Sequence, residues 1–183
     1  MSFGERRFTA EQASTIDDLP KLHFAGILLT GLAVSSDPDA PSYLNGVILD
    51  PVSSPEFEVV DPIGGWIKNN SSKTLDMAGI VTYQVAKGAG GAGELLLWSE
   101  RSLDDGATFT ENPFSLRTSE IGNNTDNSQS KSSGVRGWAP GESMRWAMYN
   151  AGAGAVTLNR PSATVNNGNV VEGVPFFWEL KEL

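Results

Sequence analysis

Residues 74–85 read Thr-Leu-Asp-Met-Ala-Gly-Ile-Val-Thr-Tyr-Gln-Val, a long run rich in β-branched and aromatic side chains. Such side chains suit the pleated, half-buried surface of a sheet, so we expect a β-strand here. The runs at 94–100 (ELLLWSE) and 144–149 (MRWAMY) have the same character. In the second, long apolar residues alternate with smaller or polar ones, as in a strand with one buried face.

Shorter runs of the same kind lie on both sides of these three. They cover residues 47–49, 56–60, 66–68, 109–110, 114–118, 155–158 and 174–180. Gly, Asn, Asp and Pro bound most of them, as they bound strands in sandwiches and jelly rolls. No stretch longer than about ten residues keeps an apolar period of 3.6, which argues against an α/β fold. The sequence predicts an all-β jelly-roll sandwich.

Composition narrows the range of functions. The chain has 183 residues, enough for one domain with a full core. It has no Cys and a single His, which excludes disulfide scaffolds, thiolate nucleophiles, Cys-ligated zinc and His-rich metal sites. We expect no cofactor.

The charge balance is acidic, with 22 acidic and 13 basic residues and a formal net charge of −9. Such a surface repels phosphate backbones, so we expect no nucleic-acid partner. The apolar stretch 24–34 is too short to span a membrane and contains Gly26 and Gly31. We therefore expect a soluble protein with no membrane partner and no export signal.

Residues 1–40 differ from the rest and are predicted to form an extended N-terminal arm and linker. They begin with a polar segment and end in the turn-rich run 35–41 (SSDPDAP). The jelly-roll sandwich is then expected to cover residues 41–183.

Two segments suggest a ligand-binding role, and each also has a simpler interpretation. Gly88, Gly90 and Gly93 match the G-x-G-x-x-G pattern, but a strand-like run follows them, which favours a flexible loop over a dinucleotide site. The polar stretch 123–133 is predicted to be an exposed loop, and it could recognise a ligand or, through Asp126, a cation. Its candidate residues are Asn123, Asn124, Asp126 and Asn127.

No catalytic constellation is visible. Asp104-Asp105-Gly106 is a hairpin-turn signal, and turn residues this close rarely provide the two facing carboxylates of a glycosidase. His23 has no Ser or Cys nucleophile motif beside it, so a packed or surface role is expected. The Trp residues at 66, 98, 138, 146 and 178 are expected mainly in the core, with subunit contacts as the alternative.

Two segments together resemble the C1q/TNF-like jelly-roll domains of tailed-phage virion proteins. The first is 97–110 (LWSERSLDDGATFT), and the second runs from the W-x-P-G turn at Trp138 to the aromatic strand 174–180 (VPFFWEL). The resemblance implies a non-enzymatic homotrimer whose last strand runs near the threefold axis. It would place Phe176, Phe177 and Trp178 in or beside the trimer interface.

The leading hypothesis is therefore a structural virion protein: a trimeric capsid decoration (cement) protein that stabilises a phage head. Its partner would be the major capsid protein, bound through arm residues Phe3, Arg6, Arg7 and Phe8. It would be assembled in the host cytoplasm and lie on the outer capsid surface. The alternative is a receptor- or glycan-binding domain of a tail or head fibre. A carbohydrate-active enzyme is a third class, which lacks a visible acid pair.

Overall fold

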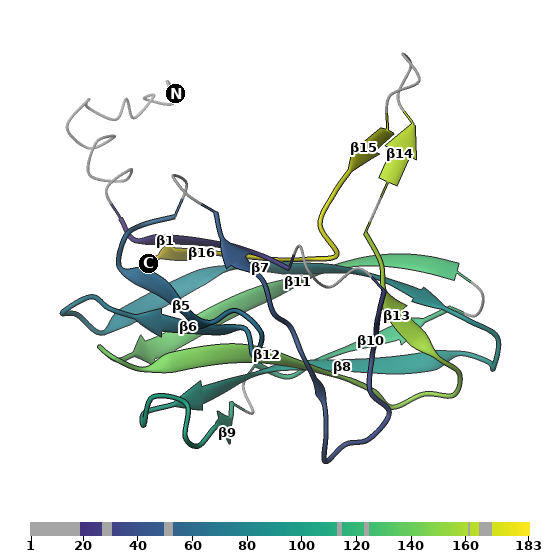
Figure 1. Cartoon of the computed structure of the whole chain (residues 1–183), viewed down its shortest axis with the longest axis horizontal. Coiled ribbons are helices and arrows are strands. Elements are labelled where there is room, and N and C mark those ends of the chain that lie inside the picture. The colour runs from purple at the N-terminus through teal and green to yellow at the C-terminus, as the bar shows by residue number, and fades with distance from the viewer. Residues whose placement is uncertain are drawn as a thin grey trace, which may run out of the picture.

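The long run that begins at Leu75 forms β7 (Leu75–Lys87), the strand around which one of two sheets is built. Figure 1 shows the computed structural model of the chain, which describes residues 19–26, 31–49, 53–112, 115–122, 125–160, 162–164 and 170–183. Alternate β7 side chains are buried, among them Met77, Val81 and Val85. This period of two is expected of a strand with one face on a core.

Among the described residues, the strands form two seven-stranded antiparallel sheets and one separate hairpin. Sheet A contains β1 (Lys21–Ala25), β2 (Leu32–Ala33), β4 (Val47–Ile48), β7, β11 (Thr125–Trp138), β13 (Val156–Leu158) and β16 (Phe176–Glu182). Sheet B contains β3 (Ser42–Tyr43), β5 (Phe57–Asp61), β6 (Trp66–Asn69), β8 (Gly93–Ser102), β9 (Thr110–Glu111), β10 (Arg117–Ile121) and β12 (Ser143–Asn150). The prediction of an all-β jelly-roll sandwich is confirmed.

The two sheets lie face to face as upper and lower layers (Figure 1). Buried aromatic side chains form part of the core between them. The Trp178 ring stacks on Trp138 at 6.2 Å between centroids and meets Trp146 edge-on at 5.5 Å. Each such pair contributes about 0.5–1.5 kcal/mol beyond its buried area. The expected core role is confirmed for these three Trp residues, whereas Trp66 and Trp98 are half-buried.

The sandwich begins earlier in the chain than predicted. β1 pairs with β16 from Lys21↔Lys181 to Ala25↔Phe177 and with β4 on its other side. Leu22 and Phe24 are fully buried in the core. The predicted boundary at residue 40 is therefore wrong. The glycines in this apolar segment made the strand hard to recognise, although its apolar residues alternate and point into the core.

The polar stretch 123–133 is not a loop where the structure describes it. Residues 125–138 form β11, which pairs with β7 along most of its length, from Thr125↔Lys87 to Trp138↔Leu75. The loop prediction is thus wrong for Asp126 and Asn127, while Asn123 and Asn124 lie outside the described residues. Among the strands that the structure describes, β11 pairs with β7 alone, so it lies at a sheet edge, where polar side chains are tolerated and protective.

Two predicted turns are confirmed. The glycine-rich segment 88–92 joins β7 to β8, and the W-x-P-G segment joins β11 to β12. In the second turn, Gly141 has a φ of 77°, a conformation that favours glycine. The buried Glu142 carboxylate closes this turn by accepting the Ala139 N–H at 2.8 Å and the Arg101 guanidinium at 2.5 Å.

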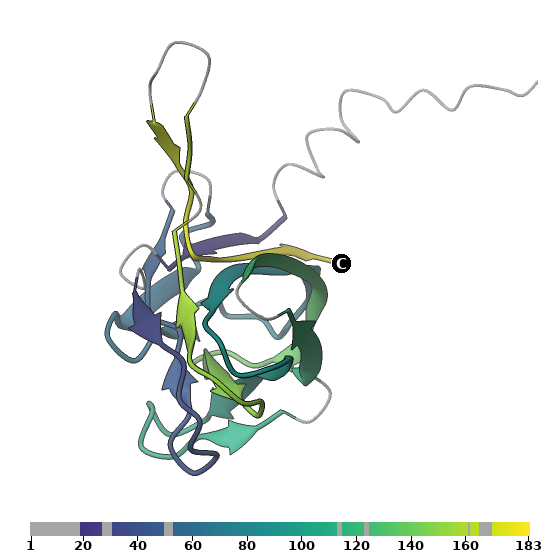
Figure 2. The same ribbon diagram turned by 90° about the vertical axis from the view of Figure 1, so that its right-hand side faces the viewer.

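One element stands apart from both sheets. β14 (Ser162–Thr164) and β15 (Val170–Glu172) pair only with each other, and their hairpin projects from the body on the side of sheet A (Figure 2). Val170 is 62% exposed there. A lone two-stranded hairpin is marginally stable in water unless further contacts support it.

Candidate functional site

The outer face of sheet B carries a row of large side chains, set by the pairing of its two central strands. In β8 and β12, Leu96 lies opposite Tyr149, Trp98 opposite Ala147, and Glu100 opposite Arg145. The alternate positions of β8, such as Leu95 and Leu97, point into the core. Strand alternation therefore places three consecutive outward positions of β8 on one surface.

Trp98 is held at the centre of this surface. Its indole Nε1 donates to Glu100 Oε1 at 3.2 Å, which fixes the orientation of the half-buried ring. The residue opposite, Ala147, is small and fully buried. On another side of the ring there is open space at the surface.

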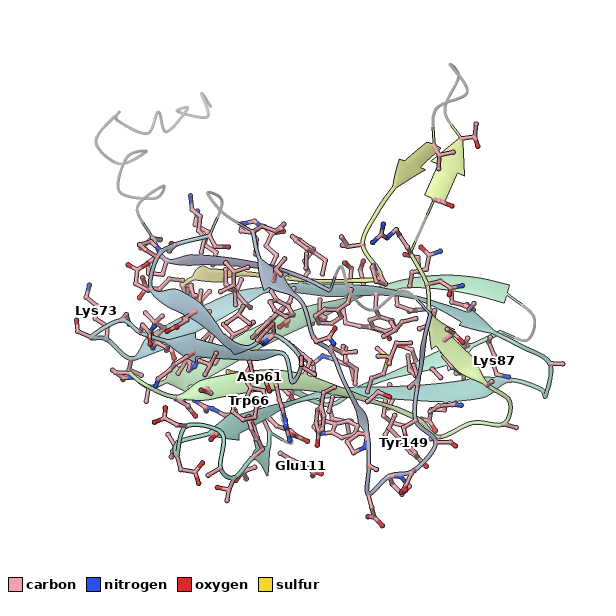
Figure 3. All side chains as sticks on the ribbon, viewed as in Figure 1. Asp61, Trp66, Lys73, Lys87, Glu111 and Tyr149 are labelled. Carbon is pink, nitrogen blue, oxygen red and sulfur yellow. The ribbon has the colours of Figure 1, made fainter. Side chains whose placement is uncertain are left out.

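That space is a surface hollow of about 360 Å³, here called the Trp98 hollow. It is lined by Pro38, Leu96, Trp98, Glu111, Asn112, Leu116 and Tyr149. Figure 3 shows Glu111 and Tyr149 on the lower side of the sandwich, away from sheet A. The volume falls within the roughly 300–1,000 Å³ of small-molecule sites.

A second hollow of about 340 Å³, the Arg145 hollow, shares Pro38, Trp98 and Glu111 with the first. Its cation is already engaged. The Arg145 guanidinium lies between the rings of Tyr43 and Phe109, at 3.6 and 3.7 Å from their centroids, and its Nε donates to Glu100 at 2.7 Å.

Burial, with a further contribution from the Glu100 charge, raises the pKa of Tyr43. The Tyr43 hydroxyl therefore stays neutral near neutral pH. In the Arg145 hollow, the Arg145 guanidinium is therefore already paired with Glu100 and packed between two aromatic rings. Glu111, by contrast, is exposed at the rim shared by both hollows.

The described residues show no sign of a metal centre or of a membrane-spanning helix. No group of three or more His, Asp or Glu among them is placed to hold a metal ion. No helix in the same part of the chain is long and apolar enough to cross a bilayer.

The Asp104 turn is a structural feature. The Asp104 carboxylate accepts the hydroxyl and the N–H of Thr108, at 2.6 and 2.9 Å, and the Ser102 hydroxyl at 2.8 Å. The Thr108 hydroxyl above all, with these other donors, lowers the pKa of Asp104 to about 2. A carboxylate this acidic is a poor proton donor at neutral pH, so it serves to hold the turn.

The predicted interface residues separate onto two faces of β16. Phe176 and Trp178 have no exposed surface within the single chain, so their side chains cannot contact a partner. For these two a place in the interface is ruled out, because strand alternation turns them into the core, whereas a place beside it is not tested. Phe177 points outward and is half-buried, with its ring 5.9 Å from that of His23. The interface prediction remains open for Phe177.

The remaining predicted site residues are not brought together. Phe3, Arg6, Arg7 and Phe8 lie outside the described residues. His23, on the outer face of sheet A, is packed against Phe177 as expected of a non-catalytic His. Sequence reasoning missed the Trp98 hollow, although the alternation in 94–100 already placed Leu96, Trp98 and Glu100 on one face.

No protein-family model matches the chain, and no curated protein matches it. Among solved structures, it is similar to "Structure of Eiger TNF from S. frugiperda", with a TM-score of 0.52 and 15% sequence identity. The match covers 90% of this chain and 92% of that one. The chain has a TNF-like jelly-roll fold. At this identity the likeness shows the fold alone, since one fold hosts many functions.

Proposed function

We propose that this protein is a homotrimeric decoration (cement) protein of a tailed-phage head. In this proposal it is assembled in the host cytoplasm, binds the major capsid protein and stabilises the outer capsid surface. The TNF-like fold is compatible with this role, and so is the resemblance of the W-x-P-G turn and the last strand to phage jelly-roll domains. The role is assembly and requires no chemistry.

The observation that carries the proposal is the projecting hairpin of β14 and β15. It pairs with neither sheet, exposes Val170, and projects on the sheet A side of the body (Figure 2). Because it lacks a third strand, contact with another subunit would supply the packing that its own domain does not. A protein that decorates a lattice needs such a contact.

The N-terminal arm supplies the second contact in this proposal. Residues 1–18 precede β1 and include Phe3, Arg6, Arg7 and Phe8. Two adjacent arginines in a chain of net charge −9 are suited to an acidic patch on a capsid subunit. The phenylalanines would add apolar anchors, which carry much of the energy of an interface.

Trimer formation is proposed to use the outer face of sheet A. Phe177 lies opposite Thr82, and Ile80, which is 43% exposed, lies opposite Glu179 two positions along. The two side chains are therefore diagonal neighbours on one face, beside His23. This apolar patch could form the centre of an interface of about 800 Å² per partner.

Deletion of residues 1–18 tests the proposal. The deletion stops short of Pro20, whose carbonyl accepts the Glu182 N–H at 2.9 Å, so β1 and β16 remain intact. We expect a folded trimer that no longer binds heads, measured by co-sedimentation with heads of the phage that encodes the protein. The untruncated chain is the control. Normal head binding by the truncated protein would contradict the proposal.

The second candidate is a receptor- or glycan-binding domain of a phage fibre. The polar stretch that first suggested it is a strand wherever it is described, so that support is gone. The Trp98 hollow now favours it, because it combines an aromatic side chain with a polar rim on a rigid sheet.

A further inference from the structure

We propose that the Trp98 hollow binds an uncharged saccharide. The inference rests on the second candidate function and names its ligand class, and it is compatible with the decoration role. A sugar ring has a flat C–H face and a rim of hydroxyls. The hollow offers the matching pair of surfaces, an apolar floor and a polar edge.

Trp98, Leu96 and Leu116 provide the apolar side chains of the lining. Because the Trp98 N–H is already donated to Glu100, the ring has only its apolar surface to offer a ligand. Leu116 is 46% exposed at one side of the ring. An exposed aromatic face beside aliphatic side chains suits the C–H face of a pyranose better than a fully polar ligand.

The rim supplies hydrogen-bonding groups at two edges. The exposed Glu111 carboxylate can accept from ligand hydroxyls, and the next residue, Asn112, also lines the hollow. The Asn112 N–H donates to the Ser99 carbonyl at 2.9 Å, which ties this edge to β8. Tyr149 adds a phenol hydroxyl from β12. All are held by strands or by segments hydrogen-bonded to them, so the site is preorganised.

Charge narrows the ligand class. Glu111 lines the Trp98 hollow, and no Lys or Arg is among the described residues that line it. In the adjoining hollow, Arg145 is committed to Glu100 and to two aromatic rings. An acidic sugar or a phosphate would meet uncompensated negative charge. A ligand cation has no free aromatic cage here, because Arg145 already occupies the one between Tyr43 and Phe109. An uncharged ligand remains.

The test uses isothermal titration calorimetry with the full-length protein. The probes are uncharged oligosaccharides of gluco, galacto, manno and N-acetylhexosamine configuration, with lactose and sialyllactose as a neutral and acidic pair. Concentrations reach about 10 mM, tenfold above a Kd of ~1 mM. We expect saturable binding of at least one neutral probe, and binding of an acidic derivative at least about tenfold weaker. Absence of saturable binding by every neutral probe would overturn the inference, as would preference for the acidic member.

Variants locate the site. Trp98→Leu keeps an apolar side chain and is expected to lower the affinity at least about tenfold, as is Tyr149→Ala on the neighbouring strand. Leu103→Ala, at a residue that is 80% exposed and outside the Trp98 hollow, is the matched control and should bind normally. Glu111→Gln should narrow the gap between neutral and acidic probes. Unchanged binding by both Trp98→Leu and Tyr149→Ala would place the ligand elsewhere and contradict the proposal.

Head binding and the mass in solution of the same variants distinguish the saccharide site from the decoration role. Trp98→Leu is expected to bind heads and to keep the mass of the unmodified protein. If no saccharide binds while head binding is normal, the saccharide site is refuted and the decoration role stands. If saccharides bind while heads do not, the decoration role fails and the fibre function is supported.

Discussion

At the scale of single residues, the Asp104 turn links hydrogen bonding to pH. Three donors from Thr108 and Ser102 lower the pKa of Asp104 to about 2, whereas an unfolded Asp titrates near 3.9. A lowered folded-state pKa means stabilisation that is present above about pH 4 and lost as the pH falls through about 2.

Asp104→Asn tests this directly. The variant should lose stability relative to the unmodified protein at neutral pH, and the difference should shrink as the pH falls from about 4 to about 2. The effect is small because the carboxylate is exposed. The urea midpoint at neutral pH and at about pH 2 measures it, with Asp39→Asn, at an exposed Asp in another turn, as the control. A difference that does not change with pH would contradict the role of the ionised carboxylate.

Also at this scale, Phe176 and Trp178 show what composition cannot settle. An aromatic residue is equally suited to a core and to an interface. Which of the two it joins depends on the face of the sheet to which its side chain points. The sequence predicted the final strand, but the inward and outward positions of Phe176, Phe177 and Trp178 follow from its pairing with β7 and β1.

At the scale of elements, β11 is rich in small polar residues, and one of them stabilises the core. Ser133 is a small polar residue in a Ser- and Asn-rich run, yet its Oγ accepts the N–H of the fully buried Trp178 at 2.8 Å. Removing a partner from a buried donor costs about 1–3 kcal/mol.

Ser133→Ala should therefore lower the free energy of unfolding by about 1–3 kcal/mol, measured by urea denaturation. Ser132→Ala is a matched control one position along on the exposed face of the same strand, and it should change stability by less than about 0.5 kcal/mol. Equal effects of the two substitutions would contradict the assigned role of Ser133.

Most strands could be predicted from alternation and turn residues, as at 74–85, 94–100 and 144–149. β11 and β1 could not, for opposite reasons. β11 is stabilised by long-range backbone pairing with β7, which a polar composition conceals. The glycines near β1 concealed a short apolar strand that packs between β16 and β4. For the candidate site, sequence periodicity could predict only which residues of β8 point outward. The rest of the hollow could not be predicted, because its other lining residues come from β12 and from two loops.

At the scale of the whole molecule, the outer face of sheet A is proposed to hold the trimer together. Phe177→Asp places a charge in the middle of the proposed contact and should convert the trimer to monomers, because burying an unpaired charge is costly. Mass in solution by light scattering measures this. Ile63→Asp changes a residue that is 80% exposed in the turn between β5 and β6, and it should leave the mass unchanged. If the Phe177→Asp protein remains trimeric, the proposed contact through Phe177 is contradicted.

The central claim is that this TNF-like sandwich assembles on a larger lattice through its arm and its projecting hairpin. Electron cryomicroscopy of phage heads prepared with and without the protein tests it most directly. We expect added density with threefold symmetry on the outer capsid surface, with the hairpin of β14 and β15 in contact with a neighbouring subunit. Heads without added density, or density from a single copy that contacts no lattice subunit, would contradict it.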